Sequence, residues 1–174
     1  MQVQLVAIVE RVCANQYSHE SNFIDFKDKV LLPSFIALHI HTPQWPQAGL
    51  ALDDELSHWL NSFTFPLESK YKDINYAREV YTNLVKKLLA NGTTSAMYFG
   101  TIHNESTLEL AKICANLGQR GFVGKVVMDD ETMNPDFYRD NSTKEAISFV
   151  TATSLFIAFS NFLANFPIIS FFSF

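Results

Sequence analysis

Segments typical of β-strands alternate with amphipathic helical segments between residues 31 and 128, and this alternation limits the fold more than any other feature. The order strand, helix, strand, helix, strand is the pattern of parallel βα units. A closed (β/α)₈ barrel needs eight strands and roughly 250 residues, so this sequence predicts an α/β fold that forms only part of such a TIM-like barrel. The expected strands are residues 34–41, 93–99 and 121–128, and the helices between them are residues 74–90 and 104–117.

Local signals set the expected ends of the helices. Asn104 is the capping candidate for the second crossover helix, and Gly118 is its expected stop. A shorter helix is expected at residues 53–63, where apolar residues recur at three- and four-residue spacing. Pro66 is expected to prevent that helix from continuing.

The sequence divides into three parts. Residues 1–30 are expected to form a short N-terminal segment of strands and turns, and residues 31–147 the partial barrel of about three parallel βα units. Residues 148–174 are an atypical apolar tail, because they hold no charged side chain and eight of the 16 phenylalanines. This tail is interpreted as an alternative or read-through end rather than as part of the barrel.

A membrane anchor is the alternative interpretation of that tail, since 27 residues are long enough to span a bilayer. Ser, Thr and Asn residues among its apolar positions, the lack of flanking basic residues and Pro167 argue against it. The expectation is therefore a protein without a membrane partner. The apolar run at residues 3–9 is followed, not preceded, by positive charge, so a signal peptide is not expected either.

Charge and cysteine content narrow the function further. With 13 basic and 18 acidic side chains, a formal charge of -5 offers no field that would attract phosphate, so no nucleic-acid partner is expected. Cys13 and Cys114 are the two cysteines, and neither has a metal-ligand or disulfide spacing. A cytoplasmic protein is the expectation.

A pair of histidines at the end of the first barrel strand is the candidate metal site. Side chains alternate faces along a strand, so His39 and His41 should project to one side, about 7 Å apart along the backbone. The carboxyl end of a parallel strand is where barrel enzymes place catalytic groups. Imidazole nitrogens suit zinc or iron, and a catalytic site would leave one coordination position for water.

The residues around this pair carry a family resemblance. Residues 33–44, PSFIALHIHTPQ, resemble the opening metal motif of the metal-dependent amidohydrolases, and the final Pro-Gln resembles guanine deaminases in particular. The order and spacing of three further segments are similar to that family. These are HWLNSFTFPLE at residues 58–68, NGTTSA at residues 91–96 and GQRGFVGKVVMD at residues 118–129.

The resemblance implies a hydrolase that converts guanine and water to xanthine and ammonia, in purine catabolism, with one zinc ion and a metal-bound water. It implies that His39 and His41 bind the metal, and that Gln44 hydrogen-bonds the purine, with His41, Thr42 and Pro43 lining the substrate site. A carboxamide suits this role because it offers both a donor and an acceptor. For full-length relatives the resemblance implies a homodimer.

In the family that the sequence resembles, the remaining metal ligands and the catalytic glutamate lie on later strands, for which this sequence has no counterpart. The catalytic residues are therefore unknown, and the expectation is a truncated guanine deaminase that is inactive or nearly so by itself. Two alternatives stay open: another deaminase or chlorohydrolase of the amidohydrolase superfamily, and a non-catalytic truncated isoform.

Four other chemically capable groups are interpreted as structural. His103 ends the second expected strand and has no matching metal partner, so a hydrogen-bonded structural histidine is expected. His58 is expected at the surface, and Cys114 is expected to be a buried small apolar residue. Asp129 and Asp130 are neighbours in a strand-end loop and should point in different directions.

Overall fold

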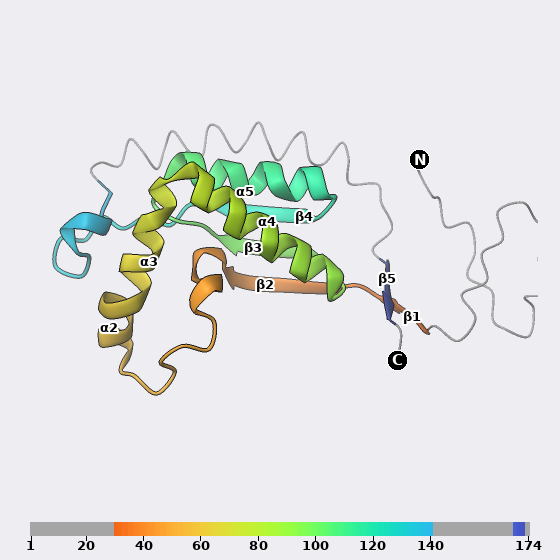
Figure 1. The fold of residues 1–174 in the computed structure, drawn as a ribbon, viewed down its shortest axis with the longest axis horizontal. Coiled ribbons are helices and arrows are strands. Elements are labelled where there is room, and N and C mark those ends of the chain that lie inside the picture. Colours follow the sequence, from red (N-terminus) through yellow and green to blue (C-terminus); the bar gives the residue numbers. More distant parts are fainter. Residues whose placement is uncertain (1–29, 141–168, 173–174) are drawn as a thin grey trace, which may run out of the picture.

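The computed structural model describes residues 30–140 and 169–172, which form two small sheets and the helices that join their strands (Figure 1). The strands are β1 (Val30–Pro33), β2 (Phe35–His41), β3 (Thr93–Phe99), β4 (Arg120–Gly124) and β5 (Ile169–Phe172). The α-helices are α2 (Leu56–Trp59), α3 (Phe65–Ser69), α4 (Ile74–Ala90) and α5 (Asn104–Leu117). Shorter helical turns are η2 (Thr42–Gln47), η3 (Leu60–Thr64), η4 (Lys70–Lys72) and η5 (Asp136–Tyr138).

The larger sheet confirms the predicted βα pattern. Its strand order is β2-β3-β4, and both pairs are parallel. Helix α4 connects β2 to β3, after the turns that follow β2, and α5 connects β3 to β4 (Figure 1). The result is an α/β arrangement with three parallel strands, as expected for part of a (β/α)₈ barrel.

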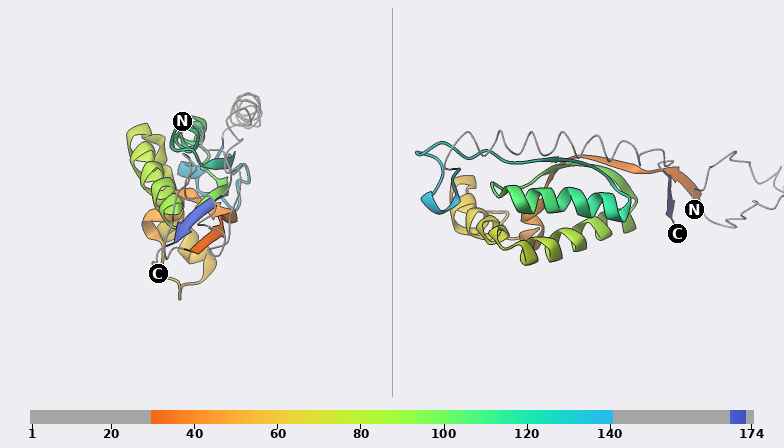
Figure 2. Two further views of the ribbon diagram at one scale, coloured as in Figure 1. Left: turned by 90° about the vertical axis from the view of Figure 1, so that its right-hand side faces the viewer. Right: turned by 90° about the horizontal axis from the view of Figure 1, so that it is seen from above.

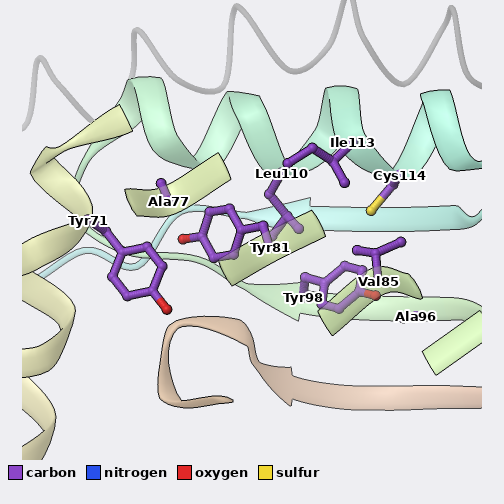
Figure 3. Packing of buried hydrophobic residues seen from close by; sticks show 9 residues of the cluster. All are labelled: Tyr71, Ala77, Tyr81, Val85, Ala96, Tyr98, Leu110, Ile113 and Cys114. Atoms are coloured by element: carbon purple, nitrogen blue, oxygen red, sulfur yellow. The ribbon is translucent and has the colours of Figure 1, made fainter. Parts of the chain in front are cut away.

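Both long helices cover the same face of this sheet (Figure 2). The core lies between these two helices and the sheet. It is a cluster of buried aromatic and aliphatic side chains from α4, β3 and α5, together with Tyr71 of η4 (Figure 3). Tyr98 of β3 is one of these buried residues, and its hydroxyl donates to Gln119 Oε1 at 2.6 Å. The buried members are Tyr71, Ala77, Tyr81, Val85, Ala96, Tyr98, Leu110, Ile113 and Cys114.

The opposite face of the sheet is open among the described residues. Because side chains alternate along a strand, Met97 points away from its core-facing neighbours Ala96 and Tyr98. Met97 and Phe122 are both exposed, and Leu38 of β2 is 70% exposed. In a closed barrel this face would be the packed interior. In the described part, helices cover one face of the sheet and nothing covers the other.

The local signals placed the crossover helices well. Helix α4 and strand β3 have the predicted bounds, and α5 ends at Leu117 with Gly118 in the left-handed region at φ 76°. The predicted cap of α5 is wrong by one residue. His103 takes the N-cap position and Asn104 is the first helical residue, because the His103 carbonyl accepts the first intrahelical bond, from the Thr107 backbone N–H at 3.1 Å.

The prediction that Pro66 ends a helix at residues 53–63 is wrong. The helical path runs from α2 through the π-turn η3 directly into α3, and Pro66 lies in the first turn of α3. Proline is tolerated there because the first turn of a helix needs no intrahelical N–H donor. The wide π-turn before it supplies the local break that the proline ring requires.

The third barrel strand is shorter than predicted. It ends at Gly124 rather than near Met128, because the following residues bond to Asp140 instead of to a neighbouring strand. Asp140 accepts from the Met128 backbone N–H at 2.8 Å, and the Asp140 N–H donates back to the Met128 carbonyl at 2.8 Å.

The predicted division into three parts is only partly covered by the described residues. Residues 1–29 and most of residues 148–174 lie outside them, so the structure does not test the predictions for those two parts. Strand β5 is described, and it pairs antiparallel with β1 in a sheet separate from β2-β3-β4. Within the described ranges, no helix has both the length and the apolar character needed to cross a bilayer.

Candidate functional site

His39 and His41 lie on one face at the carboxyl end of β2, as the period of two predicted. Their ring centroids are 4.9 Å apart, and their Nε2 atoms are 3.0 Å apart. Two nitrogens bound to one tetrahedral zinc at about 2.0–2.1 Å lie roughly 3.3 Å from each other. The pair therefore already has close to the spacing that a shared metal ion requires.

Phe99, at the end of β3, packs against both imidazoles. Its ring centroid lies 4.5 Å from that of His39 and 5.1 Å from that of His41. Since the register of β2 and β3 places His41 opposite Phe99, the sheet itself brings these rings together. The phenyl ring therefore lies against both imidazoles at the end of the sheet.

The protonation state of His41 also suits metal binding. Partial burial lowers the pKa of His41 below its ordinary value, and the neighbouring His39 lowers it further. A metal binds the neutral imidazole, so a lowered pKa leaves more of the ligating form at neutral pH. In the parts of the chain that the structure describes, no group of three or more His, Cys, Asp or Glu side chains could hold an ion. The histidine pair could therefore supply two of the ligands that a metal site needs.

The loop after His41 is the turn η2, and buried contacts hold it in place. The Tyr71 hydroxyl donates to the Pro43 carbonyl at 2.9 Å, and Gln47 Nε2 donates to the Thr64 hydroxyl at 2.8 Å. Thr42 is fully buried, and its hydroxyl has no hydrogen-bond partner among the described residues. The loop backbone is therefore fixed against α3, η3 and η4.

Gln44, the predicted purine-binding residue, is held by a carboxylate that the sequence analysis did not identify. Gln44 Nε2 donates to Glu68 Oε1 at 3.0 Å, and the Tyr138 hydroxyl donates to Glu68 Oε2 at 2.5 Å. Glu68 is only 5% exposed. Burial raises its pKa above the ordinary value, and the hydrogen bonds from Tyr138 and Gln44 oppose that rise.

Glu68 lies within the FPLE part of the segment that resembles guanine deaminases, which was the one sequence signal that pointed to it. Tyr138 carried no such signal. The structure thus brings together Gln44 of η2, Glu68 of α3 and Tyr138 of η5, three segments that are far apart in sequence.

His103 contacts Tyr138 of this network. Its described contacts do not include His39 or His41. Its ring meets Tyr138 edge-on at a centroid distance of 6.2 Å, and its Nε2 is buried without a partner among the described residues. Burial lowers the pKa of His103, as do Lys72 and Lys125. A cavity of about 260 Å³ opens beside it, lined by Tyr71, Lys72, Ile102, His103, Asn104, Glu105 and Ser106.

His58 and Cys114 lie as expected. His58 is exposed and bonds to Asp54 Oδ2 at 2.8 Å and to the Ser62 hydroxyl at 3.1 Å. Cys114 is buried in the core, and burial raises the pKa of its thiol to about 12. Asp130 accepts from the backbone of Thr132 in its own turn.

Comparisons with known proteins agree with the family resemblance of the sequence motifs. Residues 30–161 match the amidohydrolase family, and the match extends past the predicted boundary at residue 147. The guanine deaminase of Dictyostelium discoideum is 42% identical over 146 residues, covering 83% of this chain and 32% of the relative. That of Mus musculus is 46% identical over 122 residues, covering 69% of this chain and 27% of the relative.

A solved structure is similar in fold as well. The guanine deaminase of C. acetobutylicum, with guanine bound in its active site, superposes with a TM-score of 0.70 at 35% identity. That likeness covers 83% of this chain and 33% of the solved one. The chain spans about a third of the length of the relatives that it matches.

Proposed function

The chain belongs to the amidohydrolase family, and from this premise we propose that it forms the N-terminal part of a guanine deaminase, which hydrolyses guanine to xanthine and ammonia in purine catabolism. The observation that carries the proposal is the converged imidazole pair at the carboxyl end of β2, in a chain whose relatives are named guanine deaminases. A content of only two cysteines, with Cys114 a free buried thiol, supports a cytoplasmic location.

In this proposal, His39 and His41 hold one zinc ion through their Nε2 atoms. Their 3.0 Å spacing and the lowered pKa of His41 support that role. When bound, zinc lowers the pKa of water toward about 7 and so supplies hydroxide near neutral pH for attack on the purine carbon that bears the amino group. Phe99 keeps the two rings converged.

Gln44 binds the edge of the purine in this proposal. It follows His41 by three residues, on a turn whose backbone is fixed by Tyr71 and Gln47. Thr42 and Pro43 are buried, so they act by fixing the course of the loop between the metal ligands and Gln44. A rigid loop keeps the distance between the Gln44 carboxamide and the histidine pair constant.

A catalytic zinc site ordinarily has three protein ligands and a water. The described residues supply two ligands, so we propose that the remaining ligands and the general acid and base come from other residues of the enzyme.

A guanine-turnover assay tests the proposal, with the purified product of the complete coding sequence that contains these residues. We expect xanthine to form from guanine, and we expect His39→Ala or His41→Ala to lower kcat/KM by more than 100-fold, since loss of partners behind a metal ligand alone costs about 10–100-fold. His58→Ala removes an exposed histidine and is the matched control. Absence of guanine turnover in the unmodified protein, or full activity in both ligand variants, would contradict the proposal.

A further inference from the structure

We propose that Glu68 is a positioning residue that fixes the orientation of the Gln44 carboxamide, so that the amide oxygen is the atom offered to the purine. This inference rests on the proposed function, because it assigns a role within the guanine site. It concerns a carboxyl group outside the metal motif.

The direction of the Gln44 amide follows from the chemistry of its partner. An ionised carboxylate only accepts hydrogen bonds, so the amide nitrogen must face Glu68 and the amide oxygen must face away from it. The 3.0 Å contact joins Gln44 Nε2 to Glu68 Oε1. Among the described residues the Gln44 side chain makes no other hydrogen bond, so its amide oxygen is available to a ligand.

Glu68 is itself held on its other side. The fully buried Tyr138 donates its hydroxyl to Glu68 Oε2, which leaves Oε1 for Gln44. Hydrogen bonds to a carboxylate are among the stronger ones in proteins. The carboxylate is therefore fixed in position before any ligand binds. Its hydrogen bond to Gln44 Nε2 then fixes the orientation of the amide.

The loop that carries Gln44 does not depend on Glu68 for its course. Tyr71 holds the Pro43 carbonyl, and Gln47 holds Thr64, both through buried hydrogen bonds that do not involve Glu68. Loss of the Glu68 carboxylate should thus release the rotation of the amide without moving the loop backbone. This separates a positioning role from a purely structural one.

An amide oxygen with fixed orientation selects ligands that present an N–H. Guanine carries N–H donors on its ring edges, whereas a freely rotating carboxamide would accept donor and acceptor edges alike. Sites built to hydrogen-bond a substrate group reject analogues that lack it, because the buried polar group is then left unpaired. Glu68 would in this way contribute to guanine specificity without touching guanine.

The test is a double-mutant cycle in the product of the complete coding sequence, with guanine as the substrate. The variants are Gln44→Ala, Glu68→Gln and the two combined, and Glu131→Gln at an exposed loop position is the matched control. We expect E68Q to raise KM roughly 10-fold, the value of about one hydrogen bond, and to change kcat less than KM.

The double variant distinguishes the two roles of Glu68. If Glu68 acts through Gln44, E68Q has no further effect once Gln44 is alanine, whereas an independent structural effect adds to the first. Tyr138→Phe leaves the carboxylate but removes one of its donors, so it should raise KM by less than E68Q, again only while Gln44 is present.

Two different results would overturn the inference. Guanine turnover with an unchanged KM in E68Q, or with additive effects in the double variant, would leave the proposed function in place and remove this role for Glu68. A wild-type protein without guanine turnover would overturn the proposed function itself, and the role for Glu68 with it.

Discussion

At the scale of single residues, Glu68 combines a useful contact with an unfavourable environment. Burial disfavours its charge and raises its pKa, while Tyr138 and Gln44 offset part of that rise. A raised pKa means that the folded protein holds the proton more tightly than the unfolded chain does. The stability that this group contributes is thus present below its ordinary pKa of 4.5 and is lost as the pH rises through the folded-state pKa.

We therefore expect Glu68→Gln to become progressively more stable than the wild type as the pH rises. The variant keeps a side chain of similar shape but never carries the charge that burial disfavours. Thermal unfolding of the 174-residue chain between pH 4 and pH 8 measures the difference in Tm at each pH. Glu131→Gln corrects for removal of an exposed carboxylate. A wild type that gains stability over E68Q with rising pH would show that the hydrogen bonds outweigh burial.

The sequence predicted the histidine pair but not the network beside it. The positions of His39 and His41 follow from strand alternation, which is a local rule. The contact from Gln44 to Glu68 spans 24 residues, and that from Glu68 to Tyr138 spans 70. Such contacts depend on how the turns pack after β2 and β4, and no periodicity in the sequence carries that information.

At the scale of elements, the loop after β4 is anchored by a buried ion pair. Lys125 Nζ lies 2.6 Å from Asp140 Oδ1, and both side chains are 2% exposed. Asp140 also accepts from the Met128 backbone, so one carboxylate joins residues on both sides of the loop. This loop carries Tyr138, so the ion pair also holds one end of the Glu68 network.

Lys125→Met should destabilise the protein by about 3–5 kcal/mol, because it leaves the Asp140 carboxylate buried without its counter-charge. Urea unfolding of the chain measures this loss. Lys112→Met is the matched control, since Lys112 is 59% exposed and lies 3.9 Å from Glu109, and exposed pairs contribute only about 0–1 kcal/mol. Equal losses in the two variants would contradict the structural role of the Lys125 pair.

Element boundaries divide into those that the sequence predicts and those that it does not. Helix α4 ends where Asn91 and Gly92 follow, and α5 ends at a left-handed glycine, so both ends depend on neighbouring residues. Strand β4 ends early because of Asp140, and the helix at Pro66 continues because of a π-turn. Those two outcomes depend on tertiary contacts or on a rare turn.

At the scale of the whole molecule, the described residues form one covered side and one open side of a barrel segment. The helices bury one face of the sheet, whereas Leu38, Met97 and Phe122 remain exposed on the described part of the chain. An apolar face of this kind ordinarily packs against further structure. His39 and His41 are also exposed, at the carboxyl end of β2.

The 174-residue chain by itself is therefore expected to show little or no guanine hydrolysis. The described residues bring two imidazoles together, whereas a zinc site ordinarily needs three protein ligands. Xanthine formation by the purified, zinc-loaded chain measures this. Robust turnover would refute the expectation and would direct the search for ligands to a second copy of the chain.

A zinc titration of the chain tests whether His39 and His41 are the first two ligands of a metal site. NMR of the imidazole resonances follows all five histidines at once. We expect zinc to shift the resonances of His39 and His41 together and before those of the exposed His58, and we expect His39→Ala to abolish the response of His41. A titration in which His58 responds first, or in which His39 and His41 respond independently, would contradict it.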